Sequence, residues 1–185
     1  MNDIVNFLAQ RSSCSRLAEP APGRQELEDI FAAAFRAPDH ARLRPWRFLC
    51  VAGERRAAMG QLFREALLLR NPEADQPAQD KAANAPLRAP LVVVVVTRLS
   101  EHPKVPPVEQ RQSAGCAAHG ILLAAEALGY AGIWRTGAAA YDRNLMGMLG
   151  LENNEEIAGF VYLGSRQGEA RPAPQLSVSD FVADW

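Results

Sequence analysis

The sequence predicts a single domain that mixes helices with a buried sheet, without the regular strand–helix alternation of a doubly wound α/β protein. Residues 91–96 are an uninterrupted apolar run that ends in five consecutive valines. A run without alternation indicates a strand that is buried on both faces and central in its sheet. Two helical patterns precede the first predicted strand, which a doubly wound fold would not require. No glycine-rich dinucleotide motif or Walker loop is present, which argues against a Rossmann domain. The 185 residues suffice for one domain with a substantial core.

The elements before the central strand follow from hydrophobic spacing and from chain breakers. Ile4, Phe7 and Leu8 recur at helical spacing, which predicts a first short helix. A second amphipathic stripe ends at Ala37, because the residue before a proline avoids helical geometry. We further predict a strand at 48–51, a helix at 54–69 and a helical piece at 79–84.

The elements after the central strand begin with a long helical pattern at 109–128 that is rich in alanine and glycine. Small residues on a helix permit the close approach of another backbone. A strand at 133–135, a helix at 144–149 and a strand at 157–163 follow. The tail, residues 164–185, ends in apolar side chains, so we expect it to dock on another subunit.

Composition excludes several classes of protein. With 20 basic and 21 acidic residues, the formal net charge of −1 provides no field that attracts nucleic acid or anionic lipid. Three cysteines without C-x-x-C spacing argue against a disulfide framework and a zinc site. We expect Cys50 and Cys116 to be core residues. No signal-peptide pattern and no apolar run long enough to span a bilayer are seen. We therefore expect a cytoplasmic protein without a membrane partner.

Polar segments mark the candidate binding residues. The loop at 34–46 carries arginines, an aspartate and His40 between a helix and a strand, which fits an anionic cofactor or, equally, a solvated connector. Arg11-Ser12-Ser13 can clamp a phosphate, although taken alone it fits a basic helix end better. Residues 134–136, Trp-Arg-Thr, suit a flat aromatic ligand, but the tryptophan could equally belong to the core.

No catalytic set emerges from the remaining polar residues. We interpret His119 as a hydrogen-bonded interior residue, and Glu152, Glu155 and Glu156 as a solvated turn. No nucleophile, acid–base pair or metal site is evident. If the chain is an enzyme, a bound cofactor must supply the chemistry.

Several segments occur in order at separations typical of one family. These are Arg11-Ser12-Ser13, the stretch from Arg36 to His40 followed by Arg-Pro-Trp-Arg-Phe at 44–48, residues 129–137 and residues 159–164. Together they resemble the nitroreductase family, in particular its short bacterial branch of NAD(P)H nitroreductases. The resemblance covers nearly the whole chain.

The resemblance implies an α+β, nitroreductase-like fold in which helices flank a central, mainly antiparallel sheet. Residues 1–185 would form one domain of an intertwined homodimer, with residues 164–185 as an exchanged C-terminal arm. FMN would lie at each of two sites in the subunit interface. NAD(P)H would pass hydride to FMN, and a nitroaromatic, quinone or similar acceptor would then take the electrons by a ping-pong mechanism. A flavin-binding or sensor protein without significant turnover is the alternative, motivated by Ser12 and Arg44, which depart from the family pattern.

The resemblance also assigns roles to residues, none of them catalytic and none a metal ligand. Arg11, Ser12 and Ser13 would bind the FMN phosphate and ribityl chain, and Trp134, Arg135 and Thr136 would line the flavin. Arg36 and His40 would reach the FMN held mainly by the other subunit. Lys81 and Arg88 are further candidates to polarise the flavin. The segment assigned to NAD(P) is Ala124, Ala125, Glu126, Ala127, Leu128 and Gly129.

Overall fold

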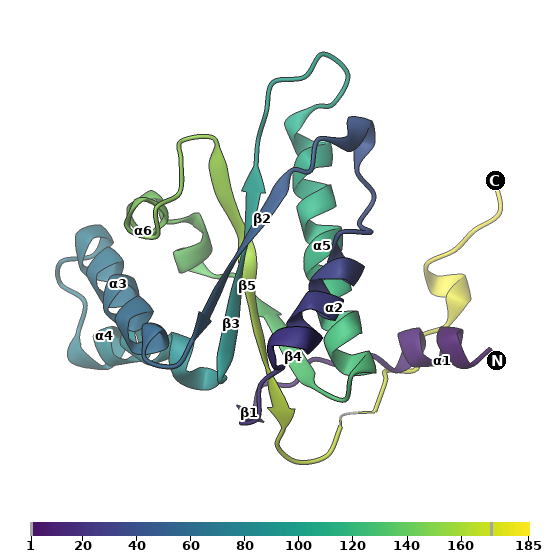
Figure 1. Cartoon of the computed structure of the whole chain (residues 1–185), viewed down its shortest axis with the longest axis horizontal. Helices are drawn as coiled ribbons and strands as arrows, with labels where there is room; N and C mark the ends of the chain where they lie inside the picture. Colours follow the sequence, from purple (N-terminus) through teal and green to yellow (C-terminus); the bar gives the residue numbers. More distant parts are fainter. Residues whose placement is uncertain (1, 171) are drawn as a thin grey trace.

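The computed structural model describes residues 2–170 and 172–185, and an antiparallel sheet lies at its centre (Figure 1). The strands are β1 (Leu17–Ala18), β2 (Trp46–Ala52), β3 (Leu91–Arg98), β4 (Ala131–Arg135) and β5 (Glu155–Arg166). Their order is β1-β5-β3-β2, and β4 pairs with β5 beside this path. Every pairing is antiparallel. The α+β class and the antiparallel sheet are thus confirmed.

The central position of β3 explains why its sequence does not alternate. Leu91, Val93 and Val95 enter the core on one face of the sheet, and Val92 and Val94 enter the core on the other. Side chains point alternately to opposite faces of a strand, so a strand covered on both sides needs apolar residues at every position. The predicted central strand is confirmed.

Helices cover both faces of the sheet (Figure 1). The α-helices are α1 (Asp3–Gln10), α2 (Arg24–Ala34), α3 (Arg55–Arg70), α4 (Gln76–Ala83), α5 (Pro107–Ala127) and α6 (Arg143–Met148). Short 3-10 turns occupy His40–Arg42, Ala85–Arg88, Ala138–Tyr141 and Val178–Asp180. Helices α2 and α5 lie on one face, and α3, α4 and α6 lie on the other. A Cβ at Gly120 of α5 would lie 3.2 Å from the Cα of Ala34 in α2. The small residues of α5 therefore permit close packing within this chain.

All the predicted helices and strands are present, but several boundaries differ. Helix α2 ends at Ala34, three residues before the predicted end, because residues 35–37 form a turn ahead of Pro38. Strand β5 is longer than predicted, since it pairs with β3 along one side and with β4 and β1 along the other. The two-residue strand β1 was not predicted, and its sequence carries no periodic signal.

Three residues that we expected inside are exposed in this chain: Cys50, Cys116 and His119. Cys50 lies on β2, the edge strand of the sheet, and the other two lie on the side of α5 that faces away from the sheet. Among the described residues, the His119 side chain has no hydrogen bond. Cys14 is the buried cysteine. The prediction assumed that apolar neighbours in the sequence imply burial. It was wrong for Cys50 and Cys116 because only one side of each element faces the core.

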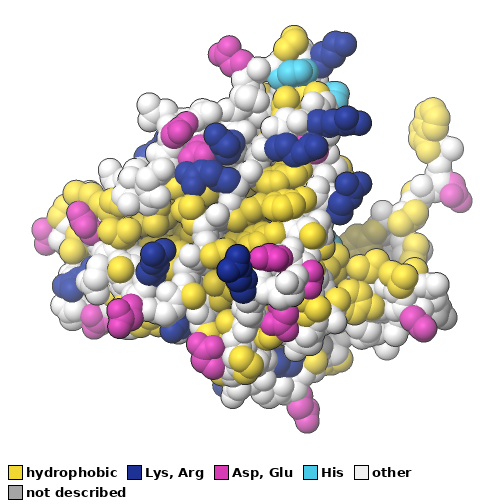
Figure 2. All heavy atoms as spheres, in the orientation of Figure 1, with side chains coloured by type: hydrophobic (Ala, Val, Ile, Leu, Met, Phe, Trp, Pro, Cys, Tyr) yellow, Lys and Arg dark blue, Asp and Glu magenta, His cyan; other side chains and the backbone are white. Residues whose placement is uncertain are grey.

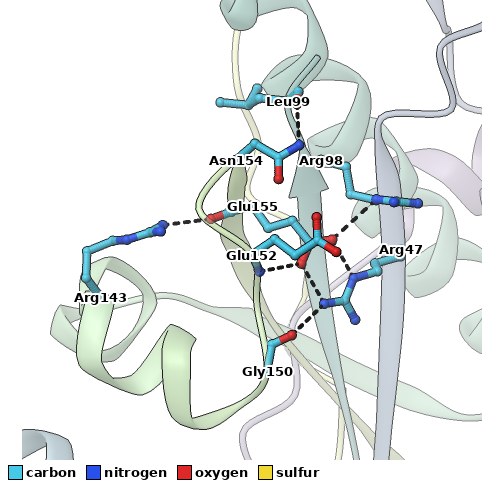
Figure 3. A network of polar contacts seen from close by, with 8 residues as sticks. All are labelled: Arg47, Arg98, Leu99, Arg143, Gly150, Glu152, Asn154 and Glu155. Atoms are coloured by element: carbon cyan, nitrogen blue, oxygen red, sulfur yellow. Dashed lines mark hydrogen bonds and ion pairs between the residues drawn. The ribbon is translucent and has the colours of Figure 1, made fainter.

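A buried carboxylate joins three strands at the start of β5 (Figure 3). The Arg47 guanidinium on β2 donates from Nε and Nη2 to the two carboxylate oxygens of Glu155, at 2.6 Å each. Arg98 on β3 approaches the same carboxylate at 3.3 Å, and the Glu152 backbone N–H donates to it at 3.0 Å. Arg143 of α6 donates to the backbone oxygen of Glu155 at 2.7 Å. The network fixes α6 and the following loop to the end of the sheet.

The prediction of a solvated acidic turn is therefore wrong for Glu155, whose side chain is 1% exposed. Glu152 is exposed, and Glu156 is partly exposed in a pair with Arg111. Hydrogen bonds from Arg47 hold the pKa of Glu155 below its usual value, against the opposing effect of burial. The arginines that bury this carboxylate are 108 and 57 residues away in the chain, so local sequence could not reveal the pairing.

Candidate functional site

The predicted phosphate-binding segment lies where the end of α1 meets the sheet. Residues 11–13 follow α1 directly, and the Cys14 N–H donates to the Gly132 oxygen of β4 at 2.9 Å. Arg166 at the end of β5 lies with its Nη2 3.5 Å from the Ser12 hydroxyl oxygen. These contacts hold the segment beside the first residues of β4.

The predicted ring-binding residues lie at the other end of the same strand. Trp134 and Arg135 are the last two residues of β4, and Thr136 follows. At the usual rise per residue, β4 separates the two groups by roughly 15 Å. The fold thus brings both predicted groups to one strand, which pairs with β5 on its inner side.

Trp134 and Arg135 point to opposite faces of the sheet, as successive strand residues must. The Trp134 indole lies toward α5, where Gly115 leaves room for it, and its Nε1 donates to the Ala158 oxygen at 3.3 Å. The Arg135 guanidinium lies 5.9 Å from the centre of the Tyr162 ring on the other face, a cation–π distance. The two side chains therefore cannot line the same face of the sheet. A ligand could contact both residues only along the outer edge of β4, where their backbone groups lie.

A cavity of about 610 Å³ opens beside Arg135, between the sheet and helices α3, α4 and α6. Its walls are mainly apolar, and Lys81, Arg88 and Arg135 bring positive charge to it. This volume is typical of cofactor and substrate sites. The cavity unites two candidate residues that no sequence motif had placed, Lys81 and Arg88, with the predicted site residues Arg135 and Thr136.

The polar groups that line this cavity, which include the Arg135 guanidinium and the Tyr162 phenol, can donate hydrogen bonds. They therefore fit a flat aromatic ligand that carries hydrogen-bond acceptors on its edge. The Nε of Arg135 is buried and has no hydrogen-bond partner among the described residues. A buried donor is normally satisfied, so this atom fits a ligand that carries an acceptor. Burial raises the pKa of Tyr162, although the charges of Arg88 and Arg135 oppose the shift. Tyr162 therefore contributes a neutral phenol to the cavity.

Arg36 and His40 lie apart from this cavity, near the beginning of α5. His40 Nδ1 lies 2.7 Å from a Glu109 carboxylate oxygen, and the Ser113 hydroxyl donates to the Pro38 oxygen at 2.5 Å. Arg36 is exposed. Figure 2 shows basic side chains gathered around this part of the molecule, over the loop that joins α2 to β2. Within one chain, the structure does not bring Arg36 and His40 to the edge of β4.

An exposed stripe on α5 separates the α2–β2 loop from β4. It consists of Val108, Gln112, Cys116 and His119. Gly120, on one side of this stripe, packs on Ala34 of α2, and Gly115, on the other side, packs on Trp134 of β4. The stripe is therefore flanked by the two groups of predicted ligand-binding residues.

The segment from Ala124 to Gly129 forms the last turn of α5 and the residues that end it. Ala125 is fully buried in the core, and Glu126 lies 3.9 Å from Arg166. The only charged residue of the segment is this glutamate. The segment is adjacent to the phosphate-binding candidates, because Glu126 and Ser12 both lie near Arg166. It lies on the face of the sheet that α5 covers, whereas the cavity lies on the opposite face.

The described part of the chain contains neither a candidate membrane-spanning helix nor a candidate metal site. No helix within residues 2–170 and 172–185 has both the length and the apolar character needed to cross a membrane. The same residues hold no group of three His, Cys, Asp or Glu side chains suited to a metal ion.

Comparison with known proteins identifies similar chains. The model of the Nitroreductase family matches residues 8–165. The chain is 42% identical over 168 residues to the "Putative NAD(P)H nitroreductase YdjA" of Escherichia coli K12, with 91% of each chain covered. It is 34% identical over 184 residues to the "Putative NAD(P)H nitroreductase" of Haemophilus influenzae, with 97% of this chain and 98% of that one covered.

Solved structures share the fold at low identity. A nitroreductase-like family protein from Bacillus cereus superposes with a TM-score of 0.84 at 17% identity, covering 100% of this chain and 97% of that one. A nitroreductase with bound FMN from Bacteroides fragilis superposes with a TM-score of 0.72 at 19% identity, covering 100% of both chains.

Proposed function

This chain belongs to the nitroreductase family, and on that premise we propose that it is an FMN-dependent NAD(P)H oxidoreductase. Its acceptors would be nitroaromatics, quinones or similar small molecules, reduced by a ping-pong mechanism. The observation that carries the cofactor assignment is the cavity beside β4, which is lined by Arg135, whose buried Nε has no hydrogen-bond partner among the described residues. Its apolar walls and basic groups fit a flavin.

The residues of β4 and the preceding loop would hold FMN along the strand. Arg11 would pair with the phosphate, since a guanidinium offers paired donors and stays charged. Ser12 and Ser13 would donate to the phosphate or the ribityl chain. Trp134, Arg135 and Thr136 would border the ring, chiefly through the outer edge of β4. When bound, FMN supplies the hydride chemistry that no side chain of this protein provides.

The basic groups of the cavity have a role during reduction. Lys81, Arg88 and Arg135 would stabilise the negative charge that develops at the ring as electrons arrive. Fixed charges in a site shielded from water are effective because they need no reorganisation during the reaction. The apolar walls would exclude water from the same space. No side chain is assigned as a catalytic acid or base.

A homodimer would complete each site. The exposed stripe of α5 would pack on its copy in the partner, and two-fold symmetry would then bring the α2–β2 loop of one subunit toward β4 of the other. Arg36 and His40 could reach the partner's FMN in this way. The single domain, residues 1–185, would be extended by the predicted arm at 164–185, of which residues 164–166 belong to strand β5 of the chain's own sheet. The last side chains of the tail are apolar and exposed (Figure 2).

The exposed edge of the sheet supports the proposal that the C-terminal arm binds the partner subunit. Among the described residues, β2 pairs with β3 alone, and an unpaired strand edge is a template for another chain. Phe181 is 74% exposed within its own subunit, as expected for a side chain that is buried on a partner.

The segment from Ala124 to Gly129 would contribute to NAD(P)H binding through its backbone and apolar surface, since it carries no cation.

The visible absorption spectrum of the purified protein tests this function. We expect a flavin spectrum, and NADPH oxidation that depends on an added nitroaromatic or quinone. Colourless protein that takes up no FMN on soaking would refute the assignment. Flavin without acceptor-dependent oxidation would favour the alternative, a flavin-binding or sensor protein, which is motivated by Ser12 and Arg44, the two departures from the family pattern.

A further inference from the structure

The loop between α2 and β2 has an unusual backbone. Ala41, Arg42 and Arg44 have φ angles of 59°, 55° and 52°, in the left-handed region that residues other than glycine seldom adopt. Such conformations cost free energy and persist only where surrounding contacts impose them, commonly at functional sites. Two of the three strained residues are arginines, so the strain fixes the direction of charged side chains.

Asp39 imposes this conformation. Its carboxylate accepts from the backbone N–H of Leu43 at 3.0 Å, from the backbone N–H of Arg44 at 3.0 Å, and from Arg44 Nη1 at 2.7 Å. The Asp39 side chain is 8% exposed, so the loop encloses it. These three hydrogen bonds offset the cost of the left-handed residues and leave the basic side chains outside.

The outward surface of the loop is positively charged. Arg36 and Arg42 are exposed and form no ion pair with any residue in 2–170 or 172–185, and Arg44 is exposed although one nitrogen contacts Asp39. The neighbouring carboxylate of Glu109 is engaged by His40. Three arginines thus face solvent where the nearby acids are already partnered. This arrangement suits phosphate groups, which arginine binds through paired donors.

The segment from Ala124 to Gly129 cannot supply that charge, since its only ionisable group is Glu126. At the usual helical rise, it lies about 25 Å along α5 from Glu109, where the α2–β2 loop packs. A nicotinamide dinucleotide needs cations for its phosphates, and the α2–β2 loop is a basic surface in the half of the molecule that would meet the partner's β4.

We propose that Arg42 and Arg44 of the α2–β2 loop form the phosphate site for the nicotinamide dinucleotide, with Arg42 as a direct ligand and Asp39 as the residue that positions the loop. The arginines of this loop outnumber the acidic groups available to pair with them, which predicts a preference for NADPH over NADH. NADPH carries a 2′-phosphate that NADH does not have. This inference rests on the proposed oxidoreductase function and adds the donor preference to it.

The test is calorimetric titration of the flavin-loaded protein with adenosine 2′,5′-bisphosphate and adenosine 5′-monophosphate, neither of which can reduce the flavin, at fixed ionic strength because exposed charges are screened by salt. Arg42→Gln should weaken bisphosphate binding about tenfold, as for the loss of one charge-assisted contact, and should affect the monophosphate less. The matched control is Arg24→Gln, which removes an exposed arginine from the start of α2. Equal binding by Arg42→Gln and the wild type would overturn the inference.

Asp39→Asn examines the positioning role. It places an amide donor beside the donors of Arg44 and should raise KM for NADPH relative to NADH while kcat at saturating donor is kept. A purely structural role would lower Tm and leave the NADPH/NADH ratio unchanged, which would overturn this assignment. The flavin spectrum is recorded for every sample. Colourless protein refutes the oxidoreductase proposal, whereas yellow protein with unaltered binding by Arg42→Gln refutes only the phosphate site.

Discussion

Replacing Glu155 by glutamine removes the negative charge at the centre of the strand network and keeps the shape of the side chain. The Glu155 carboxylate is 1% exposed and the Arg47 side chain is 30% exposed, so the pair is largely shielded from water. The substitution removes the carboxylate that is hydrogen-bonded to the Arg47 guanidinium and places opposite its donors an amide that offers one acceptor. Breaking a buried pair in this way costs about 3 to 5 kcal/mol. Because Arg47 keeps some contact with water, we expect about 3 kcal/mol.

Thermal unfolding measures this effect. For a domain of this size, about 3 kcal/mol corresponds to a fall in Tm of about 6 to 12 °C. Bound ligands and assembly raise apparent stability, so wild type and variant must be compared at equal protein concentration and equal flavin content. Urea unfolding should give a lower midpoint with an unchanged slope.

The adjacent residue provides a matched control. Glu156 also receives two hydrogen bonds from one guanidinium, that of Arg111, at 2.7 and 2.8 Å. Its side chain is 35% exposed, and ion pairs near water contribute only about 0 to 1 kcal/mol. Glu156→Gln should therefore lower Tm by at most a few degrees. Equal destabilisation by the two substitutions would refute the reasoning, because burial is the property that distinguishes the two pairs.

The pH dependence supplies a second readout of the same pair. Arg47 lowers the pKa of Glu155 in the folded protein. The stabilisation is therefore present at pH values above the pKa of the carboxyl in the unfolded chain, and it is lost as pH falls through the folded-state pKa. The free energy of unfolding should fall less steeply toward acid pH in Glu155→Gln than in the wild type.

Two further substitutions test the flavin site. Arg11→Ala should weaken FMN binding by about 2 kcal/mol, the contribution of a charge-assisted hydrogen bond, measured as flavin retained after dialysis. Arg16→Ala serves as its control, and equal flavin loss from both would contradict the role of Arg11. Gly159→Ala should displace the Trp134 indole, because the new Cβ would overlap that ring, and should lower flavin occupancy and Tm. A Cβ at Gly147 would meet no atom of the described residues within 4 Å, so Gly147→Ala should leave flavin occupancy and Tm unchanged. If Gly159→Ala also left both unchanged, the contact between Gly159 and the Trp134 indole would be excluded.

The parts of the fold that the sequence predicts are those coded by local patterns. The valine run predicts the central strand because burial on both faces leaves no polar position, and the helices follow from spacing and from chain breakers such as Pro38. The predicted phosphate-binding and ring-binding segments could be recognised because each is short and contiguous. Their common location at β4, one beside its first residues and the other at its end, required the structure, since Ser13 and Trp134 are 121 positions apart in the sequence.

Sequence patterns by themselves therefore determined the class of the fold, the order of its elements and the segments expected to contact a ligand. The tertiary structure alone decided which side chains meet: Glu155 with Arg47, Lys81 with the cavity beside Arg135, and Asp39 with the strained backbone that follows it. The physical reason is that local spacing records whether a position faces the core or solvent. The partner of a charged or polar group is instead chosen by chain segments that pack together only in the folded protein.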